Sequence, residues 1–203
     1  QPASTKPSII SSINAWGGDA VDLGIAKDTV NSLKSKLKKG LSCDMIVTIG
    51  GASVGDYDLV YKSLKEMNFK LNFWKIKMKP GKPLMFGYLK NKPIIGLPGN
   101  PVSSMVCARL FLKPSIYKLQ NHNYNENIFN FRLGKDLPKN NWRESYVRGY
   151  ISKNTKNQIV AMPISNQDSS SLSSYANADL LIIREPNARK IKKNSLVKAI
   201  ILN

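Results

Sequence analysis

Residues 45–58 read MIVTIGGASVGDYD, a short apolar run followed by a glycine-rich loop. The β-branched run 45–49 predicts a buried strand of a parallel sheet. In an open α/β sheet, ligands bind beyond the carboxyl ends of the strands. The loop supplies Gly50, Gly51 and Gly55, whose backbone N–H groups can turn toward an anion, together with the Ser53 hydroxyl. The stretch therefore predicts a ligand site at the end of its own strand.

Two acids close the same loop, and they leave a second interpretation open. Asp56 and Asp58 could hold a hard cation beside an anionic ligand, because carboxylate oxygens are preferred ligands of such ions. Asp58 could instead be the N-cap of a following helix in an ordinary strand-to-helix turn. The hydroxyl, the glycines and the paired acids together favour a site.

The segments around this stretch alternate between helical and strand-like periodicity, which is typical of a three-layer α/β domain. We expect helices at 8–16, 30–37, 59–67 and 101–119, and strands at 20–25, 45–49, 71–77, 84–88 and 93–97. The sequence pattern changes after residue 120. A polar linker is followed by five short strand-like segments at 129–133, 146–152, 158–164, 180–184 and 196–202. Residues 1–120 are thus expected to form the α/β domain, and residues 126–203 a small all-β barrel or sandwich.

The loop at residues 77–83, KMKPGKP, is the second candidate for binding an anion. Two prolines and a glycine stiffen a turn that carries three lysines, among them Lys79 and Lys82. Rigid lysines suit a fixed phosphate or oxyanion. A solvated basic turn would account for the same residues.

The third candidate is LPGNPVSS at residues 97–104. Pro98 and Gly99 precede Asn100 at an expected N-cap and a proline at the first helical position, with Ser103 in the first turn. A helix N-terminus that follows a glycine can bind an anion. Helix capping alone would also explain Asn100.

Composition limits the kinds of catalytic and metal site that are plausible, but it does not identify a binding partner. The net charge of +18 admits nucleic acid, an anionic membrane surface or a phosphorylated small molecule, although the lysines are scattered. His122 is the only histidine, which argues against a His-ligated metal or a His-centred triad. Cys43 and Cys107 lie in apolar segments and are expected to be buried thiols. No apolar run approaches the roughly 20 residues of a spanning helix, and no signal peptide is visible, so we expect a cytoplasmic protein.

The three loops, in this order and spacing, closely resemble the molybdopterin-binding domain of MoeA, of the gephyrin E domain and of their plant counterparts. The likeness extends to VDLGIAKD at residues 21–28, where the family usually carries an acid at the position of Asp28. It continues more weakly into the β domain through residues 143–148 and 167–174, similar to the MoeA C-terminal barrel. Asp168 and Ser170 stand where that family commonly has glycines, which argues against a ligand role for their loop.

The resemblance implies an enzyme that inserts molybdate into the dithiolene of adenylylated molybdopterin and releases AMP, with Mg²⁺ as the usual cation. It assigns Asp58, Asp28, Lys79 and Lys82 to the catalytic set, and Asp58, Asp28 and Asp56 to the metal. The ligand cradle then comprises Gly50, Gly51, Ser53, Gly55, Pro98, Gly99, Asn100 and Ser103. The family is dimeric. Since the chain begins at Gln1 and the two domains that precede this region in the family are absent, we expect a fragment. Alone, this fragment should bind the pterin weakly and should not insert molybdenum.

Three rival functions stay open from the sequence. A MogA-type adenylyltransferase would share the first domain, although the trailing β domain argues against it. A non-catalytic, gephyrin-like scaffold would bind a peptide without turnover. A nucleic-acid-binding module would rest on charge alone, because no aromatic RNA-binding motif appears; we expect neither nucleic acid nor a membrane as partner.

Overall fold

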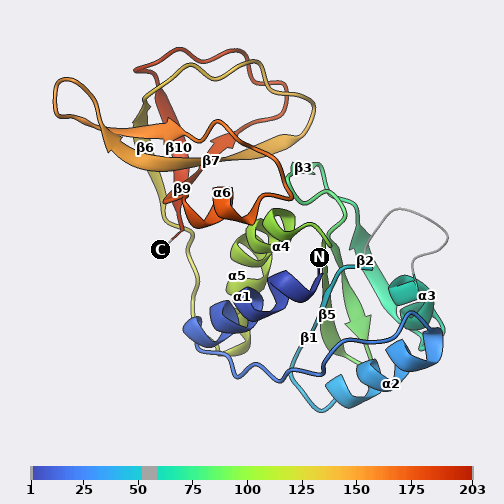
Figure 1. Ribbon diagram of the computed structural model, residues 1–203. Helices are drawn as coiled ribbons and strands as arrows, with labels where there is room; N and C mark the ends of the chain where they lie inside the picture. Colours follow the sequence, from blue (N-terminus) through green and yellow to red (C-terminus); the bar gives the residue numbers. More distant parts are fainter. Residues whose placement is uncertain (1, 52–58, 203) are drawn as a thin grey trace. The chain divides into compact units, whose positions relative to one another are not determined.

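The structure is a computed structural model that describes residues 2–51 and 59–202 (Figure 1). It divides into two compact units. Residues 1–76 and 81–124 make up the first unit, and residues 77–80 and 125–203 make up the second. The chain therefore crosses between the units near residues 76 and 80 as well as at residue 124.

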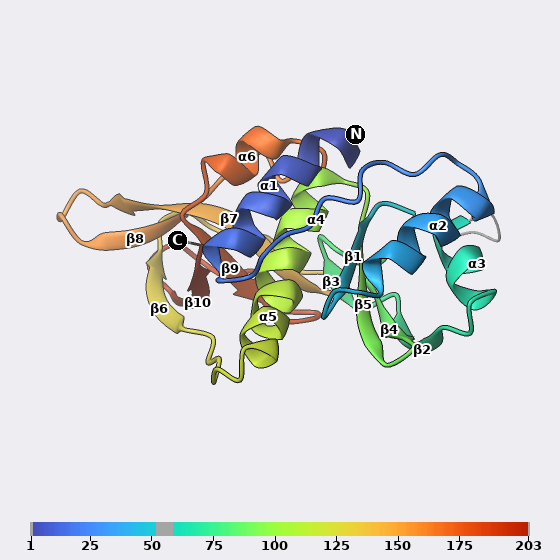
Figure 2. The same ribbon diagram turned by 90° about the horizontal axis from the view of Figure 1, so that it is seen from below.

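The first unit has three layers, as the alternating sequence pattern predicted. Its sheet has the strand order β1-β5-β4-β2, formed by β1 (Ile46–Ile49), β5 (Lys92–Leu97), β4 (Met85–Leu89) and β2 (Lys70–Trp74). Strand β1 pairs in parallel with β5, and the other two pairings are antiparallel. On one face lie α1 (Pro2–Ala15), α4 (Pro101–Cys107) and α5 (Lys113–Leu119), and on the other lie α2 (Val30–Gly40) and α3 (Leu59–Lys65) (Figure 2).

The expected long helix at 101–119 is continuous but changes its winding in the middle. The π-helical segment η1 (Ala108–Leu112) joins α4 to α5, and Pro114 is the second residue of α5, directly after the π turn. A proline removes one helical N–H donor, and a π turn is a place where the regular i→i−4 hydrogen bonds are already interrupted. The sequence pattern predicted the length of this helix but not its π turn.

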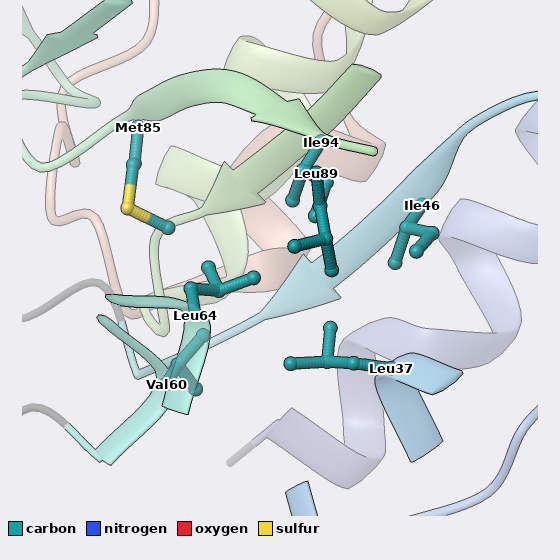
Figure 3. Close-up of a cluster of buried hydrophobic side chains, with 7 residues drawn as sticks. All are labelled: Leu37, Ile46, Val60, Leu64, Met85, Leu89 and Ile94. Atoms are coloured by element: carbon teal, nitrogen blue, oxygen red, sulfur yellow. The ribbon is translucent and has the colours of Figure 1, made fainter. Parts of the chain in front are cut away.

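An apolar core joins α2 and α3 to one face of the sheet (Figure 3). Its buried members are Leu37, Ile46, Val60, Leu64, Met85, Leu89 and Ile94. They come from two helices and three strands, and the alternate residues of β4 point into this layer while the residues between them point to the other face. The three-layer arrangement follows from burying one apolar stripe of each helix against the sheet.

The predicted strand at 20–25 is wrong. This segment has no regular secondary structure, and Val21 and Ile25, which its alternating pattern assigned to a sheet face, are 61% and 72% exposed. Gly24 adopts φ 75°, which interrupts an extended strand. The Asp22 side chain and Lys36 of α2 bond to backbone groups of this segment in place of a neighbouring strand, as described below.

The second unit is a closed five-stranded barrel. Its strands are β6 (Ile128–Leu133), β7 (Glu144–Lys153), β8 (Ile159–Pro163), β9 (Leu180–Arg184) and β10 (Leu196–Ile201). They pair in the order β7-β8-β6-β10-β9, and β9 returns to β7, which closes the sheet on itself. The five strands were predicted within two residues, and closure decides between the barrel and the sandwich. A short helix, α6 (Leu172–Ala176), was not predicted.

The predicted strand at 71–77 is divided between the two units. Strand β2 ends at Trp74, and a separate two-residue strand, β3 (Met78–Lys79), pairs in parallel with the start of β7. The Glu144 amide also donates to the Lys77 carbonyl oxygen at 3.0 Å. Residues 77–80 therefore belong to the barrel unit, although the sequence places them in the middle of the α/β domain.

Among the helices that the structure describes, none is both long enough and apolar enough to cross a membrane.

Candidate functional site

Two of the predicted loops lie side by side at the carboxyl ends of the parallel strands β1 and β5. Ile49 pairs with Leu97 as the last residue of each strand, and the Gly50 amide donates to the Leu97 carbonyl oxygen at 3.0 Å. A Cβ atom built on Gly99 would lie 3.6 Å from the Cα of Gly50. The Gly50–Leu97 hydrogen bond thus holds the starts of the two loops side by side, at the edge of the sheet where α/β domains bind their ligands.

The first of these loops needs its two leading glycines for conformational reasons. Gly50 has φ 80° and Gly51 has φ 68°, a left-handed backbone that residues with a Cβ rarely adopt. Gly50 is buried and Gly51 is exposed, so the turn leads from the sheet to the surface. The remaining predicted residues of this loop, Ser53, Gly55, Asp56 and Asp58, lie outside the described residues.

The second loop ends at the N-terminus of α4. Asn100 occupies the N-cap position, as predicted, but its side chain makes no capping hydrogen bond. Pro98 is instead tied to the helix, because the Ser104 hydroxyl donates to its carbonyl oxygen. Ser103 is 5% exposed in the first turn. Since the helix runs on through η1 and α5, its N-terminus concentrates a partial positive charge beside Gly99.

Asp28 stands next to the N-terminus of α2 and is exposed. Thr29 caps this helix through a hydrogen bond from the Ser32 amide at 3.3 Å. The Lys27 amide donates to the Ser32 hydroxyl at 2.9 Å, which fixes the approach of the chain to the helix. Within residues 2–51 and 59–202, Asp28 makes no hydrogen bond or ion pair with the two glycine loops.

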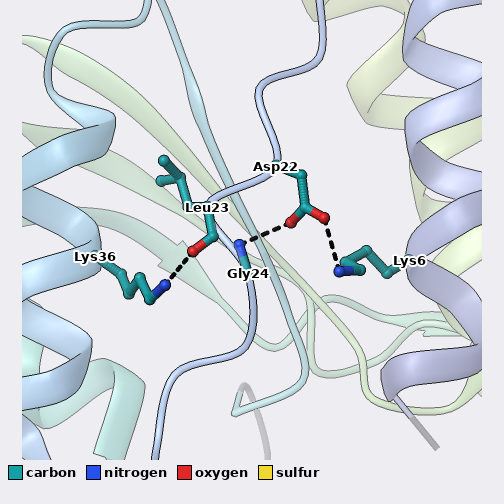
Figure 4. Close-up of polar contacts among 5 residues, drawn as sticks. All are labelled: Lys6, Asp22, Leu23, Gly24 and Lys36. Carbon is teal, nitrogen blue, oxygen red and sulfur yellow. Dashed lines mark hydrogen bonds and ion pairs between the residues drawn. The ribbon is translucent and has the colours of Figure 1, made fainter.

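The segment that leads to Asp28 is held by contacts that the sequence analysis missed (Figure 4). The carboxylate of Asp22 accepts hydrogen bonds from the Lys6 ammonium group of α1 and from the Gly24 amide, both at 2.7 Å. On the other side, Lys36 of α2 donates to the Leu23 carbonyl oxygen. The pattern Asp22-Leu23-Gly24 could have revealed this turn, since an aspartate commonly accepts from the amide two residues later.

We expect the stability of the fold to decrease when the Asp22 carboxyl becomes protonated in acid. The hydrogen bond from Lys6, and then that from Gly24, lower the pKa of this carboxyl. A folded-state pKa below the unfolded value of about 3.9 stabilises the protein above that pH, and the contribution is lost as the pH falls through the folded pKa.

Asp22→Asn should therefore lower the melting temperature at neutral pH, and this difference should shrink below about pH 4. Thermal melts at both pH values measure it, with Asp19→Asn, a change at the neighbouring exposed acid, as control. A difference for Asp22→Asn that does not change with pH would contradict the assignment.

The two predicted lysines of residues 77–83 lie on different units. Lys79 is in β3 and belongs to the barrel unit, whereas Lys82 belongs to the α/β unit. The Ile76 amide donates to the Lys82 carbonyl oxygen at 2.9 Å, and the Cys107 thiol lies 3.8 Å from the Gly81 carbonyl oxygen. Both lysine side chains are exposed. Residues 77–80 of this loop therefore bond within the barrel unit, whereas residues 81 and 82 bond within the α/β unit.

Cys43 and Cys107 are both free thiols, as predicted. Cys107 is fully buried, and burial raises its pKa well above the usual range, so the thiol stays protonated. Cys43 is only partly buried, so the predicted burial is wrong for this thiol.

The described residues do not supply a complete metal site. No three His, Cys, Asp or Glu side chains gather into a ligand cluster within residues 2–51 and 59–202. Of the predicted metal ligands, Asp28 is the one that the structure describes. Mg²⁺ commonly takes one or two carboxylates together with water and substrate phosphates, so Asp28 fits one ligand of such an ion.

The barrel loop at 164–168 is fixed against β7 by a buried arginine. Arg148 is 1% exposed, and its guanidinium donates to the carbonyl oxygens of Asn166 at 3.2 Å and Asp168 at 3.1 Å. The Gln167 amide completes the attachment by donating to the carbonyl oxygens of Arg148 and Ile164. Burial lowers the pKa of Arg148, and the charge of Asp168 opposes that shift. The loop is therefore held by the side chains of Arg148 from β7 and Gln167 from the loop itself.

Comparison with known protein families also finds two parts in this chain. Residues 2–118 match the family described as a probable molybdopterin binding domain, and residues 130–202 match the MoeA C-terminal region, or domain IV.

Named relatives share both parts. The chain is 32% identical over 182 residues to a molybdopterin molybdenumtransferase of Haemophilus influenzae, covering 88% of this chain and 45% of that protein. It is 28% identical over 188 residues to a protein of the same name from Bacillus subtilis, covering 92% of this chain and 44% of the relative. The chain thus spans less than half of the length of these relatives.

A solved structure has the same fold. A molybdopterin biosynthesis MoeA protein from Pyrococcus horikoshii superposes with a TM-score of 0.79 at 24% identity. The superposition covers 97% of this chain and 47% of the other.

Proposed function

This chain belongs to the family of probable molybdopterin-binding domains and continues into a MoeA C-terminal region, and from that premise we propose that it binds adenylylated molybdopterin for molybdenum insertion. In this reaction molybdate enters the dithiolene of the pterin, and AMP is released. The observation that carries the proposal is the contact between the Gly50 and Gly99 loops at the carboxyl ends of two parallel strands.

The chemistry of the ligand matches these loops. A pterin phosphate joined to AMP is strongly anionic, and backbone N–H groups at a glycine turn and at a helix N-terminus hold such groups without a protein charge. Pro98, Asn100 and Ser103 would complete this cradle, together with Ser53 and Gly55 of the loop outside the described residues. Lys79 and Lys82 would neutralise the remaining negative charge of the ligand.

Acidic residues would handle the cation and the oxyanion. We assign Asp28 and Asp58, with Asp56 as a further ligand, to a Mg²⁺ ion that also contacts the phosphates of the substrate. Bound there, the ion would supply positive charge that stabilises the pyrophosphate linkage as it breaks. The residues of this chain position the ligand, and no covalent nucleophile is required.

One rival activity loses support from the second unit. A MogA-type adenylyltransferase does not need the barrel that matches the MoeA C-terminal region. A scaffold without catalysis would bind no adenylylated pterin, so the binding experiment below separates it from the proposal. A homodimer and a cytoplasmic location are further parts of the proposal; the free thiols Cys43 and Cys107 are compatible with a reducing compartment.

Gly99→Ala tests the cradle with little disturbance of the fold. The added methyl group would meet the Gly50 Cα at 3.6 Å, an ordinary contact, and Gly99 does not have a positive φ. The methyl group would nevertheless stand between the two loops, where we place the ligand. We expect affinity for adenylylated molybdopterin, measured by calorimetric titration, to fall by about tenfold or more, the loss that ~1.4 kcal/mol represents.

The melting temperature of this variant should stay close to that of the parent protein, because the new contact is not a clash. Unchanged affinity in a variant of unchanged melting temperature would remove Gly99 from the site. No binding of the pterin by the parent protein would contradict the proposed function itself.

A further inference from the structure

An aromatic cluster lies on the face of the sheet opposite the α2–α3 core. Phe73 of β2 pairs across the strands with Phe86 of β4, and Tyr88 follows two residues later on the same face. The ring centroids of Phe73 and Phe86 are 5.6 Å apart, and those of Phe86 and Tyr88 are 5.4 Å apart. Phe73 and Tyr88 are 38% and 39% exposed. These three rings form a continuous exposed apolar surface, which we call the aromatic face.

A pocket of about 220 Å³ adjoins the aromatic face. Phe73 and Phe86 form part of its wall, and the helical residues Leu110, Phe111 and Pro114 form another part. Its remaining lining residues are Leu84, Met85, Ile95 and Ser115. The Ser115 hydroxyl donates to the Phe111 carbonyl oxygen at 2.7 Å. No lining residue carries a charge, so the pocket suits an apolar group.

The chain around this pocket is uniformly basic. Within the first unit, residues 67–76 and 81–124 contain seven lysines and one arginine but no aspartate or glutamate. Lys70 pairs across the strands with Tyr88 and is exposed beside the aromatic face. Lys118, also exposed, follows Pro114 and Ser115 by four and three residues, so it continues the helical stripe that lines the pocket. Lys70 thus lies beside the aromatic face on the sheet side, and Lys118 lies one helical turn beyond Pro114 on the helix side.

We propose that the aromatic face and its pocket bind an acidic peptide segment of a partner protein, with one apolar side chain inserted between Phe73, Phe86 and Phe111. Exposed apolar surfaces with polar rims are typical of protein interaction sites. Acidic groups flanking the anchor would meet the positive field of Lys70 and Lys118, which speeds association and orients the segment. This surface is separate from the glycine loops, and the proposal does not depend on the pterin chemistry.

The ring geometry favours a peptide over single-stranded nucleic acid. Base stacking needs ring faces open to the solvent. Phe86 and Tyr88 meet edge to face with an interplanar angle of 74°, and Phe73 and Phe86 are inclined by 30°, so the rings pack on one another. A pocket that accepts a single side chain is also typical of peptide anchoring rather than of base stacking.

The test uses short fluorescein-labelled peptides in which Asp and Glu flank one central Leu, Phe or Trp. Fluorescence anisotropy should detect saturable binding of at least one of them to the full chain. Replacing the central residue by Ser, or the acids by Lys, should abolish that binding. The variants Phe73→Ser and Lys70→Glu should each weaken it, Phe73→Ser by about tenfold or more because truncation of a central aromatic contact has the largest effect.

Leu71→Ser is the matched control. Leu71 is 39% exposed on the same strand, but it pairs with Gly87, so it lies on the opposite face of the sheet from Phe73. This variant should bind the peptide like the parent protein. Equal losses in Leu71→Ser and Phe73→Ser would overturn the proposal, as would failure of all the acidic peptides to bind.

Two other outcomes would assign the surface to a different occupant. Competition by a single-stranded oligonucleotide that exceeds the competition by unlabelled peptide would indicate nucleic acid. Concentration-dependent self-association that Phe73→Ser removes and Leu71→Ser retains would indicate a second copy of the chain. Either result would contradict the acidic-peptide proposal.

Discussion

Leu64→Ala is expected to lower the free energy of unfolding by about 2–5 kcal/mol, the range for truncating a buried leucine. Leu64 is 0% exposed and lies in the core between α3 and the sheet, with Leu37, Val60 and Met85 in the same cluster (Figure 3). Truncation removes apolar contacts and leaves a cavity, because a close-packed interior relaxes only partly around the missing atoms.

Urea unfolding followed by tryptophan fluorescence measures this loss, since Trp74 packs against the same cluster. The matched control is Leu71→Ala, which removes the same atoms from a side chain that is 39% exposed. That control should cost less than about 1 kcal/mol. Similar losses in the two variants would show that α3 does not depend on this core.

Gly87→Ala should lower the free energy of unfolding by about 3 kcal/mol, near the upper end of the usual cost of overpacking. A Cβ atom at Gly87 would lie 2.3 Å from the Lys70 carbonyl oxygen and 2.4 Å from Cζ of Phe69. The first of these atoms is backbone in the neighbouring strand, so it can move only if β2 shifts away from β4. The pairing of these strands, with its register shift between Leu71 and Phe73, leaves no room for a side chain.

Gly99→Ala is the control for this substitution, because the same methyl group there meets only an ordinary contact. Thermal melts of the two variants should differ clearly, with Gly87→Ala alone destabilised. If Gly87→Ala melts like the parent protein, β2 must be more mobile against β4 than their hydrogen-bonded pairing implies. In that case the aromatic face, which these two strands build, would also lose its fixed geometry.

The sequence by itself determined those features that depend on local periodicity. The β-branched run before Gly50 forms strand β1, as predicted, but β1 is an edge strand in which Ile46 alone is buried. The five short segments after residue 125 alternate as barrel strands do. Proline and glycine at 98–101 fixed the start of the long helix, because each restricts the backbone in a known way. The ordered loops also indicated the family, since each of these loops is a contiguous run of residues.

Only the tertiary structure decided the features that depend on partners distant in the sequence. Residues 20–25 alternate like a strand, but the Asp22 carboxylate accepts from the Gly24 amide and Lys36 donates to the Leu23 carbonyl oxygen, while Lys6 pairs with the Asp22 side chain. Residues 77–80 leave the α/β unit because β7, more than sixty residues later, offers them a hydrogen-bonded edge. The aromatic face likewise exists because strand register places Phe73 beside Phe86. Such pairings join residues far apart along the chain, and local propensity carries no information about which of them will form.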